Sequence, residues 1–167
     1  MSIKNKNVLS IIKKVKQILD TSNISYWLGR GVLGDLLVNK ELKCKHSDVD
    51  FHILNEDRET LRSKLLPEFK NEYEIDDKDY KLAFYKPIKN PEFYFEFPYI
   101  FNDPVNSNQV YHISCEKNRY CPKECFDIKK FNYIEIENIK VRIPTLTEEY
   151  FKNIYDGQWK NRYKLRK

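Results

Sequence analysis

Residues 47–54 are the stretch that most narrows the range of folds open to this chain. Apolar and polar side chains alternate there without interruption, in the order Asp48, Val49, Asp50, Phe51, His52 and Ile53. Because successive side chains of a strand point to opposite faces, this alternation predicts a strand with one buried face and one polar face. We expect Val49 and Phe51 to lie in the core, behind a face that presents two carboxylates side by side.

The rest of the chain predicts helices and further short strands around this one. Helix patterns mark residues 8–19, 32–38, 56–69 and 147–155. Strand patterns mark residues 24–28, 73–75, 80–85, 93–100 and 132–143, the last as two short strands that turn at Asn138. This order predicts a mixed α/β (α+β) domain, in which a small, mainly antiparallel sheet is flanked by helices.

The chain has 167 residues, which is enough for one compact domain and few for two. We expect a single domain over residues 1–159, followed by a basic C-terminal tail over residues 160–167. Such a tail is usually solvated, and contact with an anionic substrate, a membrane surface or nucleic acid is the alternative. Elsewhere basic and acidic residues interleave, so the net charge of +5 is mild and no nucleic-acid partner is expected.

No stretch of the sequence is typical of a membrane span or a signal peptide. The apolar positions of residues 8–19 are interrupted by Lys13, Lys14 and Lys16, which indicates an amphipathic helix. We therefore expect no transmembrane segment and a cytoplasmic protein, in which cysteines are reduced.

Asp48 and Asp50 are the strongest candidates for a chemical role. Residues two apart in a strand share a face, so these carboxylates would lie close together and repel each other. A divalent cation removes that cost, and Mg²⁺ binds one or two carboxylates while water and phosphate oxygens complete its shell. Phosphoryl-group chemistry uses such a site. The other interpretation is a pair of surface aspartates, because Asp-x-Asp alone is a weak signal.

A glycine-containing turn precedes this strand. Residues 26–28 are apolar and run into Gly29, Arg30 and Gly31, after which a helix is predicted. Glycine lets a backbone approach a phosphate, the beginning of a helix offers free N–H groups, and Arg30 can add a charge-assisted contact. The turn predicts phosphate binding by these three residues, and the alternative is a tight connection without a ligand.

Two further side chains are candidates for the same site. Glu96 is the one charged residue inside the aromatic strand of residues 93–98, and a buried carboxylate needs a partner or a metal. His52 shares the predicted face of Asp48 and Asp50, where it can orient a phosphate or bind a metal. Each has a plainer interpretation, namely a solvent-facing Glu96 and a structural His52.

Together these segments resemble the nucleotidyltransferase-fold superfamily, and within it the LicD family, which includes bacterial phosphorylcholine transferases and the fukutin-related proteins. Residues 26–33 resemble the opening strand and "G-T-L-L" turn of that family. Residues 46–51 resemble its acidic "D-D-D-I-D-I" strand, and residues 95–98 its "D-I-F-P" strand. Residues 141–159 are similar to its closing segment, so the resemblance spans most of the chain.

The resemblance implies that Asp48, Asp50 and Glu96 are catalytic residues that bind Mg²⁺ or Mn²⁺, and that Gly31 lines the phosphate-binding turn. It implies a donor activated with cytidine diphosphate (CDP), whose choline, glycerol or ribitol phosphate passes to a hydroxyl group, usually on a sugar of a glycan. The acceptor hydroxyl would attack in line, and Glu96 would accept its proton.

Several positions depart from the family pattern. Val32 stands where Thr or Ser is common, and Glu96 replaces the commoner Asp. His46 and Ser47 replace two acids before Asp48. Two other hypotheses therefore stay open. One is a nucleotidyltransferase that uses a nucleoside triphosphate to modify a small hydroxylated molecule such as an antibiotic, and the other is a non-catalytic binding module on the same fold.

A separate group combines one histidine and three cysteines: His112, Cys115, Cys121 and Cys125. Four ligands of these types suit a structural zinc site, but their spacing is not that of paired C-x-x-C motifs. Zinc is therefore the less favoured interpretation, and cysteine as a small core residue is the more favoured one.

Overall fold

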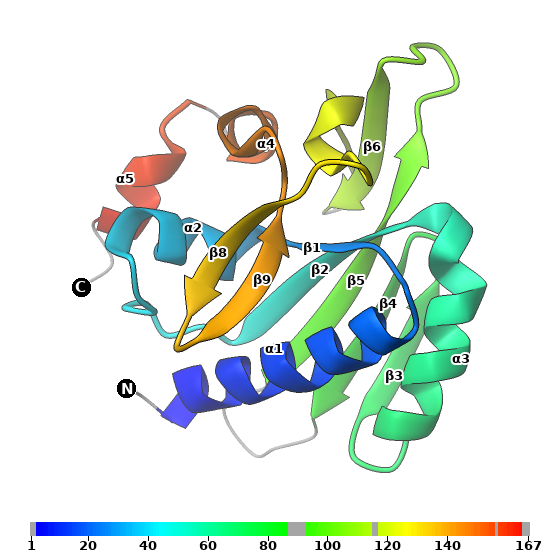
Figure 1. The fold of residues 1–167 in the computed structure, drawn as a ribbon, viewed down its shortest axis with the longest axis vertical. Helices are drawn as coiled ribbons and strands as arrows, with labels where there is room; N and C mark the ends of the chain where they lie inside the picture. Colours follow the sequence, from blue (N-terminus) through cyan, green and yellow to red (C-terminus); the bar gives the residue numbers. More distant parts are fainter. Residues whose placement is uncertain (1–2, 87–92, 115–116, 156, 165–167) are drawn as a thin grey trace.

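A mixed sheet runs through the centre of the molecule (Figure 1), whose computed structural model describes residues 3–86, 93–114, 117–155 and 157–164. Its strands are β1 (Tyr26–Leu28), β2 (Asp48–Leu54), β3 (Glu74–Lys78), β4 (Lys81–Lys86), β5 (Phe93–Asn102), β6 (Gln109–Ser114) and β7 (Lys117–Pro122). The order is β1-β2-β5-β4-β3, and β6 pairs with the end of β5 and with β7. β2 and β5 run parallel, and the other pairs of the described strands are antiparallel, which confirms the mixed, mainly antiparallel sheet.

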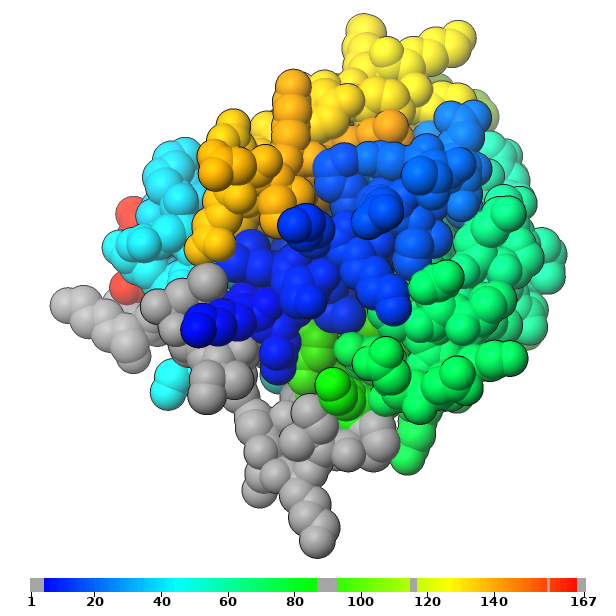
Figure 2. All heavy atoms as spheres, turned by 60° about the horizontal axis from the view of Figure 1, so that its bottom comes forward, coloured from blue at the N-terminus to red at the C-terminus, as the bar shows by residue number. Residues whose placement is uncertain are grey.

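Helices α1 (Ile3–Thr21) and α3 (Arg58–Phe69) cover one face of this sheet (Figure 1). A separate hairpin, β8 (Asn132–Ile136) with β9 (Ile139–Ile143), lies beside α1. Figure 2 shows α1 lying between this hairpin and α3. No helix in the described part of the chain is both long and apolar enough to cross a membrane.

The apolar residues of the alternating strand face these two helices. Val49, Phe51 and Ile53 are fully buried. Phe69 of α3 packs edge to face against Phe95 of β5, with ring centres 4.9 Å apart. Burial of each such side chain contributes about 1.5–3 kcal/mol. A register shift of one residue would turn all of them outward, so the same burial fixes the direction of the carboxylates on β2.

The polar face of β2 is covered near its end by α4 (Thr147–Tyr155), whose Tyr150 bonds to His52. Helix α2 (Arg30–Asn39) follows β1, and α5 (Trp159–Lys164) packs on α2. Short 3₁₀ turns, η1 (Asn55–Asp57) and η2 (Lys123–Phe126), follow β2 and β7.

Residues 160–164 belong to α5, a helix that the sequence did not predict, while four of these five residues are exposed, as expected of a solvated segment. Tyr163 is 4% exposed. Gly34 of α2 has no room for a side chain, because a Cβ there would overlap the Tyr163 ring. Lys160 pairs with Glu148 of α4 at 2.6 Å. The basic residues Lys160, Arg162 and Lys164 are therefore exposed, while Tyr163 anchors the helix through an apolar contact.

The β8–β9 hairpin confirms the two short strands predicted around Asn138. Glu137 and Asn138 have φ angles of 45° and 67°, the left-handed pair that a two-residue type I′ hairpin loop requires. By contrast, β6 and β7 lie in a region for which the sequence predicted no strand.

Candidate active site

Asp48, Asp50 and Glu96 lie on one face of the neighbouring strands β2 and β5. The parallel register places Asp50 opposite Glu96 and Asp48 opposite Tyr94. Asp50 and Glu96 are 2% and 6% exposed, whereas Asp48 is partly exposed. The structure thus brings together the three carboxylates that the sequence predicted to share a site.

Two basic side chains offset part of this negative charge. Nη1 of Arg30 lies 3.0 Å from Oδ1 of Asp50 and 2.8 Å from Oε1 of Glu96. Nζ of Lys81, on β4, donates to Oε2 of Glu96 at 2.8 Å. Arg30 donates a hydrogen bond to Glu96, but its approach to Asp50 is an ion pair without hydrogen-bond geometry. With Asp48, three carboxylates face two cations, so one negative charge is left over when all are ionised.

The surroundings act in opposite directions on the two buried carboxyls. Burial, with the charges of Glu96 and Asp48, raises the pKa of Asp50 well above its ordinary value despite Arg30 nearby. Burial also acts on Glu96, but Arg30 and Lys81 outweigh it and hold the pKa of Glu96 below its ordinary value. Such opposed shifts in adjacent carboxyls are a feature of functional sites.

The turn between β1 and α2 approaches these carboxylates through its backbone. The N–H of Gly29 donates to the backbone carbonyl of Asp50 at 3.0 Å. A Cβ on Gly29 would lie 2.6 Å from the His52 ring and 2.6 Å from the Tyr150 hydroxyl, closer than real side chains approach. Only glycine allows this turn to sit so close to β2 and α4.

Arg30 has an unusual backbone for a residue with a side chain. Its φ angle is 46°, in the left-handed region that costs a non-glycine residue about 1–2 kcal/mol. Its N–H donates to the Tyr150 hydroxyl at 3.0 Å, and that hydroxyl is 2.6 Å from Nε2 of His52. Tyr150 therefore links the turn to β2 and stabilises the strained backbone.

Gly31 lies in the first turn of α2 with space beside it, since a Cβ there would meet Nδ1 of His46 as its nearest atom, at 3.7 Å. N–H groups at the beginning of a helix lack intrahelical partners and attract anions. Phosphate binding by this turn stays a prediction: there is space beside Gly31, but Tyr150 already uses the N–H of Arg30.

His52 has no exposed surface, which argues against the predicted contact of this ring with phosphate or metal. Its ring packs against His112 of β6 at 4.8 Å and Phe126 at 5.5 Å between centres. Burial, the neighbouring His112 and Arg30 lower the pKa of His52 well below its ordinary value, so it is neutral. In this structure His52 supports the turn through Tyr150.

The predicted zinc ligands do not form a metal cage among the described residues. Cys115 lies outside them, and His112 faces His52. Cys121 and Cys125 are buried free thiols, and the Cys125 thiol donates to the backbone carbonyl of Leu146 at 3.7 Å. No three His, Cys, Asp or Glu side chains of the described ranges are grouped as metal ligands, and this finding covers Asp48, Asp50 and Glu96 as well as the described members of the predicted zinc set.

The carboxylates do suit Mg²⁺ or Mn²⁺ by their chemistry. Such ions prefer oxygen ligands and bind in phosphate sites through one or two carboxylates, with water and phosphate completing the shell. Asp48 and Asp50 would supply those carboxylates, with Glu96 across the register. Oδ1 of Asp50 is buried and makes no hydrogen bond with the described residues, and its contact there is the ion pair with Nη1 of Arg30 at 3.0 Å. Arg30, however, already lies against Asp50 and Glu96.

Asp35 is a buried charge that the sequence did not single out. It is fully buried in α2 and accepts hydrogen bonds from Asn39 at 2.7 Å and from the backbone N–H of Cys44 at 2.8 Å. Nε2 of His46 lies 2.9 Å from Oδ2, the same oxygen that accepts from Cys44. Asp35 thereby holds the connection that leads into Asp48. The signal was present, because Asp35 is the one charged residue within residues 32–38, which are otherwise apolar.

An aromatic pair lies beside the carboxylates on the same face. The rings of Tyr85 and Tyr94 stack with centres 5.3 Å apart and are partly exposed. The Tyr94 hydroxyl donates to Oδ2 of Asp48 at 3.4 Å. The site therefore borders a flat ring surface, on which a base or sugar ring can pack.

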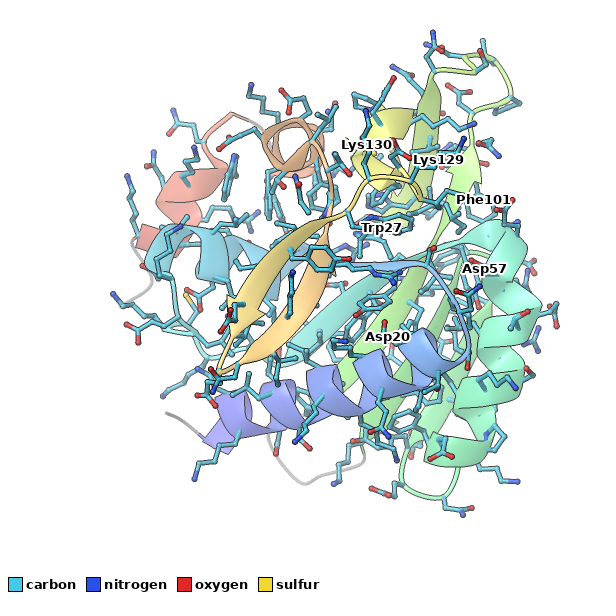
Figure 3. All side chains as sticks on the ribbon, viewed as in Figure 1. Asp20, Trp27, Asp57, Phe101, Lys129 and Lys130 are labelled. Atoms are coloured by element: carbon cyan, nitrogen blue, oxygen red, sulfur yellow. The ribbon has the colours of Figure 1, made fainter. Side chains whose placement is uncertain are left out.

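A cavity of about 740 Å³ opens at the other end of β2, lined in part by Leu54, Phe101 and Phe126. Phe101 lies toward the start of α3, near Asp57 (Figure 3), and Trp27 lies beneath the loop that carries Lys129 and Lys130. His52 packs on Phe126, so this aromatic layer separates the cavity from Asp50. The cavity is therefore not the space above the carboxylates.

Solved structures with the same arrangement of helices and strands are nucleotide-transferring enzymes. The lincosamide antibiotic adenylyltransferase LnuA, with lincomycin bound, superposes with a TM-score of 0.54 and 14% identity over 92% of this chain and 94% of that one. The solution structure of the antibiotic-resistance factor ANT(2'')-Ia superposes with a TM-score of 0.53 and 16% identity, over 98% of this chain and 84% of that one. The crystal structure of ANT(2'')-Ia with adenylyl-2''-tobramycin superposes with a TM-score of 0.51 and 17% identity, over 86% of this chain and 71% of that one.

No protein-family model matches the sequence, and no curated protein matches it either. The likeness is thus one of structure, and it shows that this chain has the nucleotidyltransferase fold. The fold class expected from the sequence is therefore confirmed. Nothing in these comparisons singles out the LicD family.

Proposed function

We propose that the protein transfers a nucleotidyl group from a nucleoside triphosphate to a hydroxyl group of a small molecule. The observation that carries this proposal is the carboxylate set Asp48, Asp50 and Glu96 on adjacent strands, beneath the turn that begins α2. Adenylyltransferases for small hydroxylated antibiotics share the fold, which favours this reaction over transfer from a CDP-activated alcohol.

In this reaction the acceptor oxygen forms a bond to the α-phosphorus of the donor, and the bond from that phosphorus to the bridging oxygen breaks. Pyrophosphate leaves, and the hydroxyl proton passes to a carboxylate. A bound Mg²⁺ would offset the charge that develops on the phosphates. The first turn of α2 would hold phosphate oxygens, and Asp48 and Asp50 would orient the metal. We assign the proton to Glu96, which becomes a better base once Arg30 leaves it for phosphate.

The first test is a comparison of donors by thermal shift with Mg²⁺ or Mn²⁺. ATP, GTP, CTP and UTP are compared with CDP-choline, CDP-glycerol and CDP-ribitol, because a ligand of the native state raises its apparent stability. The variant is Asp48→Asn with Asp50→Asn. Asp79→Asn is the matched control, since Asp79 lies on the surface and contacts Arg58 away from the site.

We expect metal-dependent stabilisation by a nucleoside triphosphate, lost in the double variant and kept in Asp79→Asn. Release of pyrophosphate with lincomycin, tobramycin or other hydroxylated acceptors would then identify the class of acceptor. Stabilisation by a CDP adduct alone would favour the LicD-type reaction that residues 95–98 and 141–159 resemble. If no donor stabilises the protein, the hypothesis of a non-catalytic binding module on this fold is favoured.

A further inference from the structure

We infer that Arg30 is a resident counter-ion that competes with the divalent cation for Asp50 and Glu96, and that the triphosphate of the donor draws it away. This inference rests on the proposed function and concerns how metal and donor binding are coupled. It makes Arg30 a positioning residue that links the two ligands.

The competition follows from where the guanidinium lies. One nitrogen, Nη1, faces both Oδ1 of Asp50 and Oε1 of Glu96, at 3.0 Å and 2.8 Å. These are the oxygens that a cation between the two strands would use. Two positive groups on the same pair of oxygens repel each other strongly in a site as buried as this one. Arg30 therefore lowers the affinity of the donor-free protein for metal.

The position of the Arg30 backbone indicates which group the guanidinium would bind after it leaves the carboxylates. Arg30 is the first residue of α2, where free N–H groups attract phosphate. A triphosphate bound there lies within reach of the Arg30 side chain, and a guanidinium pairs with phosphate through two parallel hydrogen bonds. The donor thus offers the guanidinium an alternative partner of higher charge.

The turn keeps its shape when this side chain moves. The Arg30 backbone is held by the Tyr150 hydroxyl, and Gly29 by the carbonyl of Asp50. Neither hydrogen bond involves the guanidinium. Lys81 keeps its own bond to Glu96, so that carboxylate stays paired while Arg30 leaves. Only Asp50 loses its cation, and the metal replaces it.

The experiment measures Mn²⁺ binding by the electron paramagnetic resonance signal of free Mn²⁺, with and without the α,β-methylene analogue of ATP. The variants are Arg30→Gly, which also relieves the left-handed backbone, and Arg30→Gln, which keeps the size of the side chain without its charge. Arg62→Gln is the matched control, because Arg62 pairs with Asp77 in another part of the molecule.

Without the analogue, we expect Mn²⁺ affinity to rise on the order of tenfold in both Arg30 variants, within the range typical of coupled sites. Arg62→Gln should bind Mn²⁺ like the wild type. With the analogue, the difference between the Arg30 variants and the wild type should shrink, since Arg30 has already left the carboxylates. Mn²⁺ alone should also raise the melting temperature of Arg30→Gly more than that of the wild type.

Equal Mn²⁺ affinity in the wild type and the Arg30 variants, without the analogue, would overturn the inference while leaving the proposed function intact. Absence of Mn²⁺ binding in every protein, with or without the analogue, would overturn the proposed metal site and the inference together. If an Arg30 variant is unfolded without metal, failure of Mn²⁺ to restore its fold counts against the inference, because a competing cation must be able to replace the guanidinium.

Discussion

At the scale of single residues, the two glycines of the turn have different reasons to be glycine. A Cβ on Gly29 would lie 2.6 Å from the His52 ring and from the Tyr150 hydroxyl, whereas one on Gly31 would have ordinary contacts. We expect Gly29→Ala to lower the free energy of unfolding by about 1–3 kcal/mol through overpacking. Gly31→Ala should be neutral or stabilising by up to about 1 kcal/mol, because alanine favours a helix. Urea unfolding of both variants measures this, and equal effects would contradict it.

Asp35 is a second residue with a structural role, and we expect it to contribute strongly to the free energy of unfolding. Its carboxylate is fully buried and accepts from Asn39 and from the backbone of Cys44, so removing it leaves buried donors without a partner. We expect Asp35→Ala to lower the free energy of unfolding by about 3 kcal/mol. Asp103→Ala, which removes an exposed carboxylate bonded to a loop N–H, should cost about 0.5 kcal/mol or less. A loss as small in Asp35→Ala as in Asp103→Ala would refute the buried network.

His112 makes the stability depend on pH. It is 1% exposed, and neither ring nitrogen has a hydrogen-bond partner among the described residues. Burial, with Arg30 and Arg119 nearby, lowers the pKa of His112 to about 3. The unfolded chain, with a pKa of about 6.5, binds more protons between these values, so stability is full above pH 6.5 and is lost as pH falls. The loss should reach at most about 1.4 kcal/mol per pH unit from this group.

Urea unfolding at pH 7.5, 6.0 and 5.0 measures that slope. His112→Leu should have a shallower slope than the wild type, because leucine has no proton to gain. His52 is also buried and neutral, so part of the slope should remain in the variant. An unchanged slope would show that His112 is protonated in the folded protein.

The site residues could be predicted where a local pattern fixes them. Strict alternation on β2 determined that Asp48 and Asp50 share a face, and the single charge in an aromatic strand indicated Glu96. Their partners could not be predicted in the same way. The contact of Arg30 with Glu96 joins residues 66 apart, and that of Lys81 depends on how β4 pairs with β5. The sequence placed Arg30 at a phosphate, but no local pattern shows that it lies on the carboxylates.

At the scale of helices and strands, the sequence was reliable wherever burial on one side produces a period. β2, β5, α3 and α4 were predicted because each has such a face. β7 was not, because it is largely exposed and has polar residues at most positions, as in Lys117, Asn118 and Arg119. A strand exposed on both faces gains little from apolar alternation, so its sequence has no clear period. β6 was not predicted either, although Val110 and His112 on one of its faces are buried.

Helix α5 was missed for a related reason, since most of its six residues are basic or polar. The apolar contact depends on Trp159 and Tyr163, four residues apart, which is one helical turn. We expect Tyr163→Ala to lower the free energy of unfolding by about 3 kcal/mol, as for other large rings removed from a core. Lys160→Ala, on the exposed side, should change it by about 0.5 kcal/mol or less. Chemical unfolding compares the two variants. If Tyr163→Ala leaves the free energy of unfolding unchanged, the Tyr163 side chain does not stabilise the fold, as expected of a solvated tail.

For the whole molecule, the fold class follows from the order of elements, and the similarity to adenylyltransferases of the same fold agrees with it. The reaction does not follow from the fold, because one fold supports several chemistries and the site alone decides among them. Here the site places buried carboxylates together, which is costly for the folded state as a whole unless each has a cation. Under the proposed function, activity and stability therefore depend on the same three side chains.

This dependence predicts opposite effects for two neighbouring substitutions. Burial with Glu96 and Asp48 nearby disfavours a charged Asp50, so Asp50→Asn should raise the free energy of unfolding of the metal-free protein, by on the order of 1 kcal/mol. Glu96 is held in its charged form by Arg30 and Lys81, so Glu96→Gln leaves both cations short of a partner and should lower it by about 3 kcal/mol. Both variants should lose metal-dependent stabilisation by a nucleoside triphosphate. Urea unfolding in a chelating buffer at pH 7.5 measures the change in the free energy of unfolding of each variant. Thermal shift with metal and a nucleoside triphosphate measures binding. If Asp50→Asn is as destabilising as Glu96→Gln, then Asp50 is a satisfied partner of Arg30 and not a carboxylate kept at a cost for the binding of a metal.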